Sequence, residues 1–249
     1  MINKCKEEDF DQIKSVSLGR LSTSSLSGFF WGVFAFSAVM TVVAFGGLGS
    51  LGSGISTFIA LMITSSLFLF LVQFVFTLFF TSKKIAFKFQ KLQSVFLSFI
   101  GFKFSLDMYQ FFFVFCEASG SPEYIKNTGF ISLFGGIIFL IFSTFRAVKR
   151  VKQGELRNSG KGLYDFQNSK GYVSVPIIFG VTMFGGALGR YFSDMSSDVT
   201  VLFALLFAVV LQYSLALALP EFFLLTYCKF RFESFKVKRP DSRMRGSKR

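Results

Sequence analysis

The stretch "IGFKFSLDMYQ", residues 100–110, places Lys103 and Asp107 four residues apart inside a long apolar segment. A charged side chain near the centre of a bilayer costs about 2.5 to 3.5 kcal/mol on an insertion scale. Residues 94–116 also contain thirteen Phe, Leu, Ile and Val residues, each of which favours insertion by about 0.3 to 0.6 kcal/mol. The two contributions nearly cancel, so the composition of this segment alone does not decide whether it crosses a membrane.

The rest of the chain has the composition of a membrane protein. Of its 249 residues, 52% are hydrophobic and 39 are Phe, and the mean hydropathy is +0.55. The apolar residues form continuous blocks, which is typical of membrane-spanning helices. Six blocks are long enough to cross about 30 Å of hydrocarbon. They are Gly28–Leu48, Ser56–Thr81, Ser94–Cys116, Thr128–Phe145, Val173–Phe192 and Val199–Leu219.

The basic residues between these blocks predict the orientation of the chain. With the N-terminus inside, the cytoplasmic segments 1–27, 82–93, 146–172 and 220–249 hold 4, 4, 7 and 9 Lys and Arg residues. The external loops and helix ends hold only Lys126 and Arg190. Because Lys and Arg are enriched on the cytoplasmic side, we predict an all-α, polytopic membrane helix bundle. It has six transmembrane helices, and its N-terminus and C-terminus are both cytoplasmic.

This charge distribution also decides whether residues 94–116 cross. If they did not, every later segment would change sides, and one of the strongly basic segments after them would lie outside. We therefore expect this block to span the membrane in spite of its two charges. The compensation has to come from within the protein, either from the pair itself or from neighbouring helices.

Two interpretations of Lys103 and Asp107 remain open. They lie one turn apart on one helix face and can form an ion pair that only fixes packing. Alternatively, they line a polar pathway or substrate site, because ionisable residues inside spans are usually functional. Other intramembrane polar candidates have simpler interpretations, namely interhelical hydrogen bonds or an interfacial position facing Lys229 or Arg231. These candidates are Gln73, Gln110, Gln212 and Glu221.

Small residues predict where helices approach closely. The tripeptide Phe-Gly-Gly occurs at 45–47, 134–136 and 184–186. Glycine allows close contact between helix backbones, and glycine or proline can also form a hinge. We expect packing or hinge positions at Gly135, Gly136, Gly185, Gly186, Gly189 and Pro220.

The composition argues against most catalytic and metal chemistry. The chain contains no histidine, so the commonest general base and metal ligand is missing. Cys5, Cys116 and Cys228 are far apart and form no metal-binding motif. We therefore predict no catalytic residue, no metal and no cofactor, although a Ser-Lys arrangement of Lys103 with Ser98 or Ser105 is conceivable.

Three segments and their partners follow from this organisation. Residues 1–27 form a cytoplasmic segment in which Phe10, Ile13 and Val16 are spaced for one face of an interfacial helix. Residues 28–219 form the six-span domain, and residues 220–249 form a basic tail. The expected partners are the bilayer, anionic headgroups at the basic loops and tail, and a membrane protein or second copy. The net charge of +13 is explained by location, so nucleic acid is not expected.

Two functional interpretations follow for a non-enzymatic, multi-pass membrane protein. The first is a small transport or permease-like subunit, or the membrane component of a transport or secretion assembly. The second is a partner-binding immunity protein against a membrane-active toxin or bacteriocin. The richness in Phe and Lys is typical of bacteria with AT-rich genomes, so we expect a bacterial cell membrane as the location.

Overall fold

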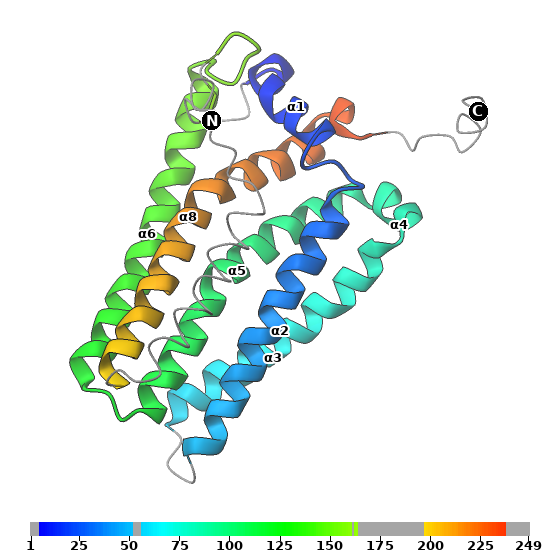
Figure 1. The fold of residues 1–249 in the computed structure, drawn as a ribbon. Helices are drawn as coiled ribbons and strands as arrows, with labels where there is room; N and C mark the ends of the chain where they lie inside the picture. The colour runs from blue at the N-terminus through cyan, green and yellow to red at the C-terminus, as the bar shows by residue number, and fades with distance from the viewer. Residues whose placement is uncertain (1–4, 52–55, 161, 164–196, 238–249) are drawn as a thin grey trace, which may run out of the picture.

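The computed structural model describes residues 5–51, 56–160, 162–163 and 197–237, and its regular elements there are all helical (Figure 1). Five helices are long and apolar enough to span a membrane. They are α2 (Leu26–Leu51), α3 (Thr57–Thr81), α5 (Gln90–Ala118), α6 (Glu123–Lys152) and α8 (Ser197–Arg231). The all-helical fold is confirmed for the described residues, and the predicted span Val173–Phe192 lies outside them.

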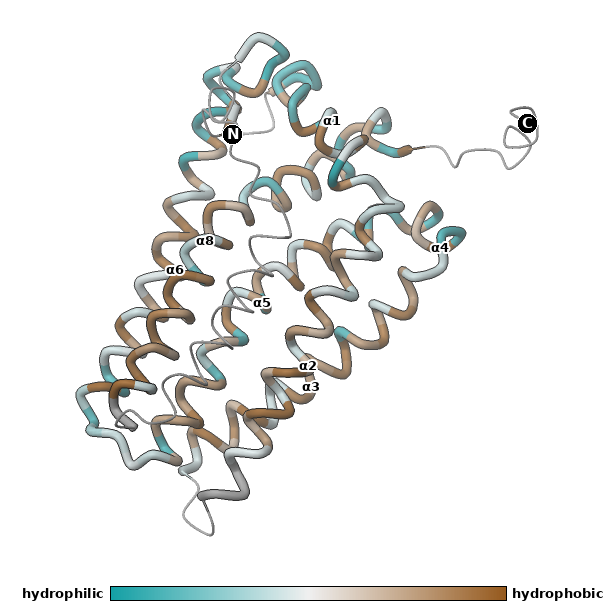
Figure 2. The backbone as a smooth tube through the Cα atoms, viewed as in Figure 1, coloured by the Kyte–Doolittle hydropathy of each residue, from teal (hydrophilic) through white to brown (hydrophobic). Residues whose placement is uncertain are grey.

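Short helices gather at one end of the bundle, which we call the basic end. It holds a single turn at Glu7–Phe10, α1 (Asp11–Leu18), α4 (Lys83–Lys88) and the turn 153–160 (Figure 1). It also holds the last turns of α8 and the single turn Glu233–Phe235. Hydrophilic residues are concentrated there, whereas hydrophobic residues line the middle of the long helices (Figure 2). The described chain leaves the basic end at residue 163 and resumes at Ser197, at the opposite end (Figure 1).

The central helix of the bundle is α5. It packs against α2, α3, α6 and α8. Within its apolar 18-residue stretch, 67% is buried inside the protein, against 17% of the corresponding stretches of α3 and α6. Its mean hydropathy of 1.3 is the lowest of the five, whose other values are 1.9 to 2.4. The helix that is least suited to lipid is therefore the one that other helices cover, which explains how it can carry two charges.

Pro220 lies inside α8, which bends part-way along its length (Figure 1). Proline lacks the backbone N–H that would continue the helical ladder, so a bend at this position is expected. The helix nevertheless continues through Pro220 to Arg231. Next to Pro220, α8 packs closely on α5, because a Cβ on Gly101 would lie 2.7 Å from Leu219 Cδ2.

The N-terminal segment is part of the protein core at the basic end. Phe10 and Ile13 are almost fully buried, and the Phe10 ring lies 5.7 Å from that of Phe232 after the end of α8. The Gln12 backbone N–H donates to Leu156 O at 3.0 Å, and the Arg157 guanidinium donates to Asp9 Oδ1 at 2.7 Å. The apolar face of α1 is therefore covered by protein, and we call residues 5–18 the cap.

Candidate functional site in the core of α2, α3 and α5

Lys103 and Asp107 bind each other inside the bundle. Lys103 Nζ lies 2.8 Å from Asp107 Oδ1 and 2.9 Å from Oδ2. Ser37 of α2 completes the group: its Oγ accepts from Lys103 Nζ at 3.1 Å and donates to Asp107 Oδ2. Lys103 and Asp107 are only 5% and 6% exposed. Ser37, Lys103 and Asp107 are called the charge cluster below.

The charge cluster is complete in itself. The three donors of an ammonium group have three acceptor oxygens within 3.1 Å, and the cluster has no net charge. The Ser37 hydroxyl donates to Asp107 rather than to Lys103, so the amine is not placed to remove its proton. The two serines that the sequence suggested as partners of Lys103 are bonded elsewhere: Ser98 to Thr226, and Ser105 to the Phe102 carbonyl.

A row of polar residues on α3 faces the same core. Gln73, Thr77 and Thr81 follow each other at four-residue intervals, so they lie one turn apart on one helix face. We call them the polar ladder. Thr81 is exposed at the basic end, where its Oγ1 accepts from the Trp31 indole N–H at 3.0 Å. Among the described residues, Thr77 Oγ1 and both amide atoms of Gln73 are buried and have no hydrogen-bond partner.

Two interhelical contacts place Gln73 close to the depth of the charge cluster. Ser66 of α3 donates to Gln110 Oε1 of α5. Because the helices are antiparallel, Gln73 and Lys103 each lie two turns nearer the basic end than that contact. The stacked rings of Phe76 and Phe96, 5.1 Å apart, give a second reference that places Gln73 about one turn nearer the basic end than Lys103. The polar ladder thus extends from an exposed end to the level of Lys103 or within a turn of it.

Gln212 belongs to a different polar group, between α5, α6 and α8. It accepts from the Tyr109 hydroxyl at 2.8 Å and donates to the Leu133 carbonyl at 3.0 Å. Gly136 makes room for it, since a Cβ at Gly136 would lie 2.1 Å from the Gln212 side chain. A Cβ at Gly135 would meet only the Tyr213 hydroxyl, at 2.9 Å. The sequence-predicted positions Gly185, Gly186 and Gly189 lie outside the described residues.

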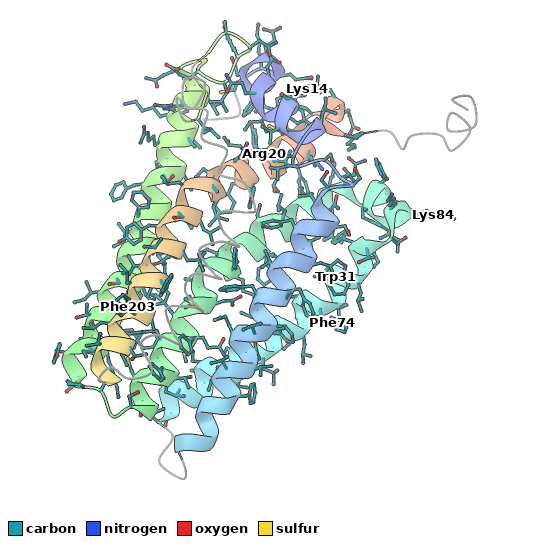
Figure 3. All side chains as sticks on the ribbon, viewed as in Figure 1. Lys14, Arg20, Trp31, Phe74, Lys84 and Phe203 are labelled. Atoms are coloured by element: carbon teal, nitrogen blue, oxygen red, sulfur yellow. The ribbon has the colours of Figure 1, made fainter. Side chains whose placement is uncertain are left out.

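Glu221 and Lys229 do not pair with each other, although both lie on the part of α8 at the basic end. Glu221 is bound by Arg20, whose Nη2 lies 2.6 Å from Glu221 Oε1, and Figure 3 shows Arg20 where α1, α2 and α8 meet. Lys229 is 1% exposed, and its Nζ has no hydrogen-bond partner among the described residues. Glu221 therefore ties the N-terminal segment to the end of α8.

The described residues offer little to a metal ion or cofactor. Within that part of the chain, no three Cys, Asp or Glu residues gather closely enough to hold a metal, and all three cysteines are buried as free thiols. Comparison with protein families, curated proteins and solved structures finds no match to this chain. The function has to be argued from the chemistry of the buried polar groups.

Two residues of this core were not singled out from the sequence. Ser37 was missed because a hydroxyl in an apolar span usually bonds to its own helix, and nothing in the sequence shows that it meets Asp107. Thr77 could have been found, because Gln73, Thr77 and Thr81 share the four-residue spacing of one helix face. That spacing is the signal to look for in such spans.

Proposed function

We propose that the chain is a non-enzymatic, multi-pass membrane protein that works as a small transport or permease-like subunit, or as the membrane component of a transport or secretion assembly. The polar ladder is the observation that supports this proposal. It begins at the exposed Thr81 and continues to the depth of Lys103. A buried polar atom without a partner costs about 1 to 3 kcal/mol, so a helix that served packing alone would gain by replacing Gln73 with an apolar residue.

The proposal includes six spans. The described chain ends at residue 163 at the basic end and resumes at Ser197 at the opposite end. The 33 residues between them include the apolar block Val173–Phe192, and 20 helical residues reach about 30 Å. The basic segments at one end favour a cytoplasmic location for that end and for both termini, in the cell membrane of a bacterium.

A flux measurement tests the transport function. The purified chain is placed in sealed lipid vesicles that contain a pH-sensitive dye, and a proton gradient is imposed. We expect the gradient to collapse faster than in protein-free vesicles. Thr77→Val should slow the collapse, while Thr64→Val should not, because Thr64 lies on the exposed face of the same helix. Equal rates with and without the protein would contradict a permease that acts alone on protons.

The closed charge cluster favours the second candidate, a partner-binding immunity protein. Lys103 and Asp107 satisfy each other and Ser37, so they need no substrate to be stable in the bundle. An immunity protein needs only a stable bundle with a recognition surface. A neighbouring gene for a small secreted toxin would support this function, whereas a neighbouring ATPase gene would support transport.

A further inference from the structure

We infer that Gln73 and Thr77 form an internal water-binding site in the core of α2, α3 and α5, reached from the aqueous phase at the basic end past Thr81. This site is separate from the charge cluster, which is complete without it. It does not depend on transport, because a static hydrated site would show the same chemistry. It assigns a ligand class and a side of access, neither of which the proposed function specifies.

The unpaired atoms are the first observation. Gln73 is 0% exposed and Thr77 is 1% exposed. Among the described residues, Gln73 Nε2, Gln73 Oε1 and Thr77 Oγ1 have no hydrogen-bond partner. Three unpaired polar atoms on adjacent turns of one helix are unusual, because buried polar groups in proteins are almost always bonded to protein or to ordered water.

The surrounding aromatic rings show that this site lies between three helices. The Phe34 ring of α2 stacks on Phe70 and Phe74, at 5.0 and 5.3 Å. Phe76, three residues beyond Gln73, stacks on Phe96 of α5 at 5.1 Å. These rings contact α2 on one side of Gln73 and α5 on the other. Among the described residues, the amide is thus enclosed by apolar groups and has no protein partner, and a small molecule would complete its hydrogen bonds.

The available groups favour water over an ion. A cation would need carboxylate or several carbonyl oxygens, and the carboxylate at this depth, Asp107, already binds Lys103 and Ser37. An anion would need several N–H donors or a free cation, whereas Gln73 supplies one amide group and Lys103 is paired. Gln73 and Thr77 each offer both a donor and an acceptor, which suits a neutral molecule that also does both.

The spacing of the polar ladder suits bridging water molecules. The Cβ atoms of residues four apart on a helix are separated by about 5 to 6 Å. Two hydrogen bonds of about 2.8 Å through one water molecule cover that distance. Thr81 Oγ1 donates to the Thr77 carbonyl and accepts from Trp31, which leaves it one lone pair for a water molecule. One water can then bridge Thr81 to Thr77 Oγ1, and another can bridge Thr77 to Gln73. The Trp31 indole, bonded to Thr81 Oγ1 at 3.0 Å, lies at the entrance.

Cysteine labelling tests the site and its side of access. In a chain whose three native cysteines are replaced by alanine, Thr77→Cys and Gln73→Cys are compared with Val75→Cys and Leu71→Cys. The last two side chains lie on the outer face of α3 at the same depth and are 62% and 53% exposed. A charged methanethiosulfonate reagent is added to one side of sealed vesicles. Lys84→Cys on α4 and Tyr124→Cys at the start of α6 report which end of the bundle faces the reagent.

We expect Thr77→Cys and Gln73→Cys to react at least about tenfold faster than the two controls, because thiolates form in water and not in lipid. The reaction should occur only when Lys84→Cys is also labelled. Rates equal to those of the controls would overturn the water site. Equal rates from both sides would overturn the access from the basic end. Labelling without proton flux would support the site and contradict a permease that acts alone on protons, so the two proposals fail separately.

A second measurement needs no cysteine. If water satisfies the amide of Gln73, Gln73→Leu should change the equilibrium constant of unfolding by less than about threefold. If the amide were truly unpaired, the same change would stabilise the protein and lower the equilibrium constant of unfolding by about tenfold or more. Gln212→Leu is the matched control: it removes the acceptor of the Tyr109 hydroxyl and the donor to the Leu133 carbonyl, and it should destabilise the protein. A tenfold stabilisation by Gln73→Leu would overturn the inference.

Discussion

The charge cluster and the polar ladder lie in the same three-helix core but differ in how their groups are satisfied. In the charge cluster, Lys103 and Asp107 bind each other and Ser37. In the polar ladder, Gln73 and Thr77 have no partner among the described residues. A buried ion without a partner costs several kcal/mol, whereas an uncharged amide or hydroxyl costs about 1 to 3 kcal/mol. Within this three-helix core, the protein thus satisfies its two charges internally and leaves only neutral groups open.

The largest effect is expected from breaking the charge cluster on one side. Lys103→Ala or Asp107→Ala alone should destabilise the protein by about 3 to 5 kcal/mol, because each leaves an unpaired buried charge. The combined Lys103→Leu and Asp107→Leu variant should have a free energy of unfolding close to that of the wild type, since apolar replacement of a buried pair is often neutral or stabilising. Unfolding in mixed detergent micelles measures both, with the exposed Lys84→Ala as the control.

The outcome also decides what the pair does. If the double variant is stable and unchanged in proton flux, Lys103 and Asp107 serve only each other. If it is stable but has lost flux, the pair belongs to the pathway. A double variant that loses as much stability as the two single variants together would contradict the closed cluster. The free-energy effects of substituting two groups that bind each other should not be additive.

A smaller effect is expected at the neighbouring polar group around Gln212. Gly136→Ala should destabilise the protein by about 1 to 3 kcal/mol, because its Cβ would lie 2.1 Å from the Gln212 side chain. Gly32→Ala is the matched control, since a Cβ there meets nothing within 4 Å. Helix propensity favours alanine at both positions. A Gly136→Ala variant as stable as Gly32→Ala would show that Gln212 moves aside at little cost.

Helix geometry made the local part of this site predictable from sequence. The long apolar blocks identify α2, α3, α5, α6 and α8, and the four-residue spacing of Lys103 and Asp107 places them on one face. Contacts between helices were not predictable, because they depend on which faces pack together. Gln212 therefore bonds to Tyr109 and not to the charge cluster. Glu221 bonds to Arg20, more than 200 residues away in sequence, rather than to the nearby Lys229.

The smallest expected effect lies outside the five long helices, where the cap is attached to the turn 153–160. Burial raises the pKa of Asp9, but hydrogen bonds from Arg157 and from the Lys6 backbone N–H outweigh burial and leave the pKa below its ordinary value of 3.8. Because the pKa of Asp9 is lowered in the folded state, ionised Asp9 stabilises the docked cap at pH values above its ordinary pKa. That stabilisation is lost as the pH falls through the folded-state pKa, so the cap should loosen only in acid.

Hydrogen-exchange protection factors of residues 9–18, which correct for intrinsic exchange rates, measure this loosening between about pH 2 and 6. Arg157→Ala should lower protection at neutral pH and weaken its acid dependence, because only the Lys6 backbone N–H then remains to lower the pKa of Asp9. The decrease should be small, because Arg157 is largely solvent-exposed and exposed ion pairs contribute little. Gln12→Ala, which removes side-chain bonds to the Arg157 and Gly160 carbonyls, should lower protection and leave the acid dependence in place. If Arg157→Ala kept that dependence at its full size, another carboxyl group would have to control the docking of the cap.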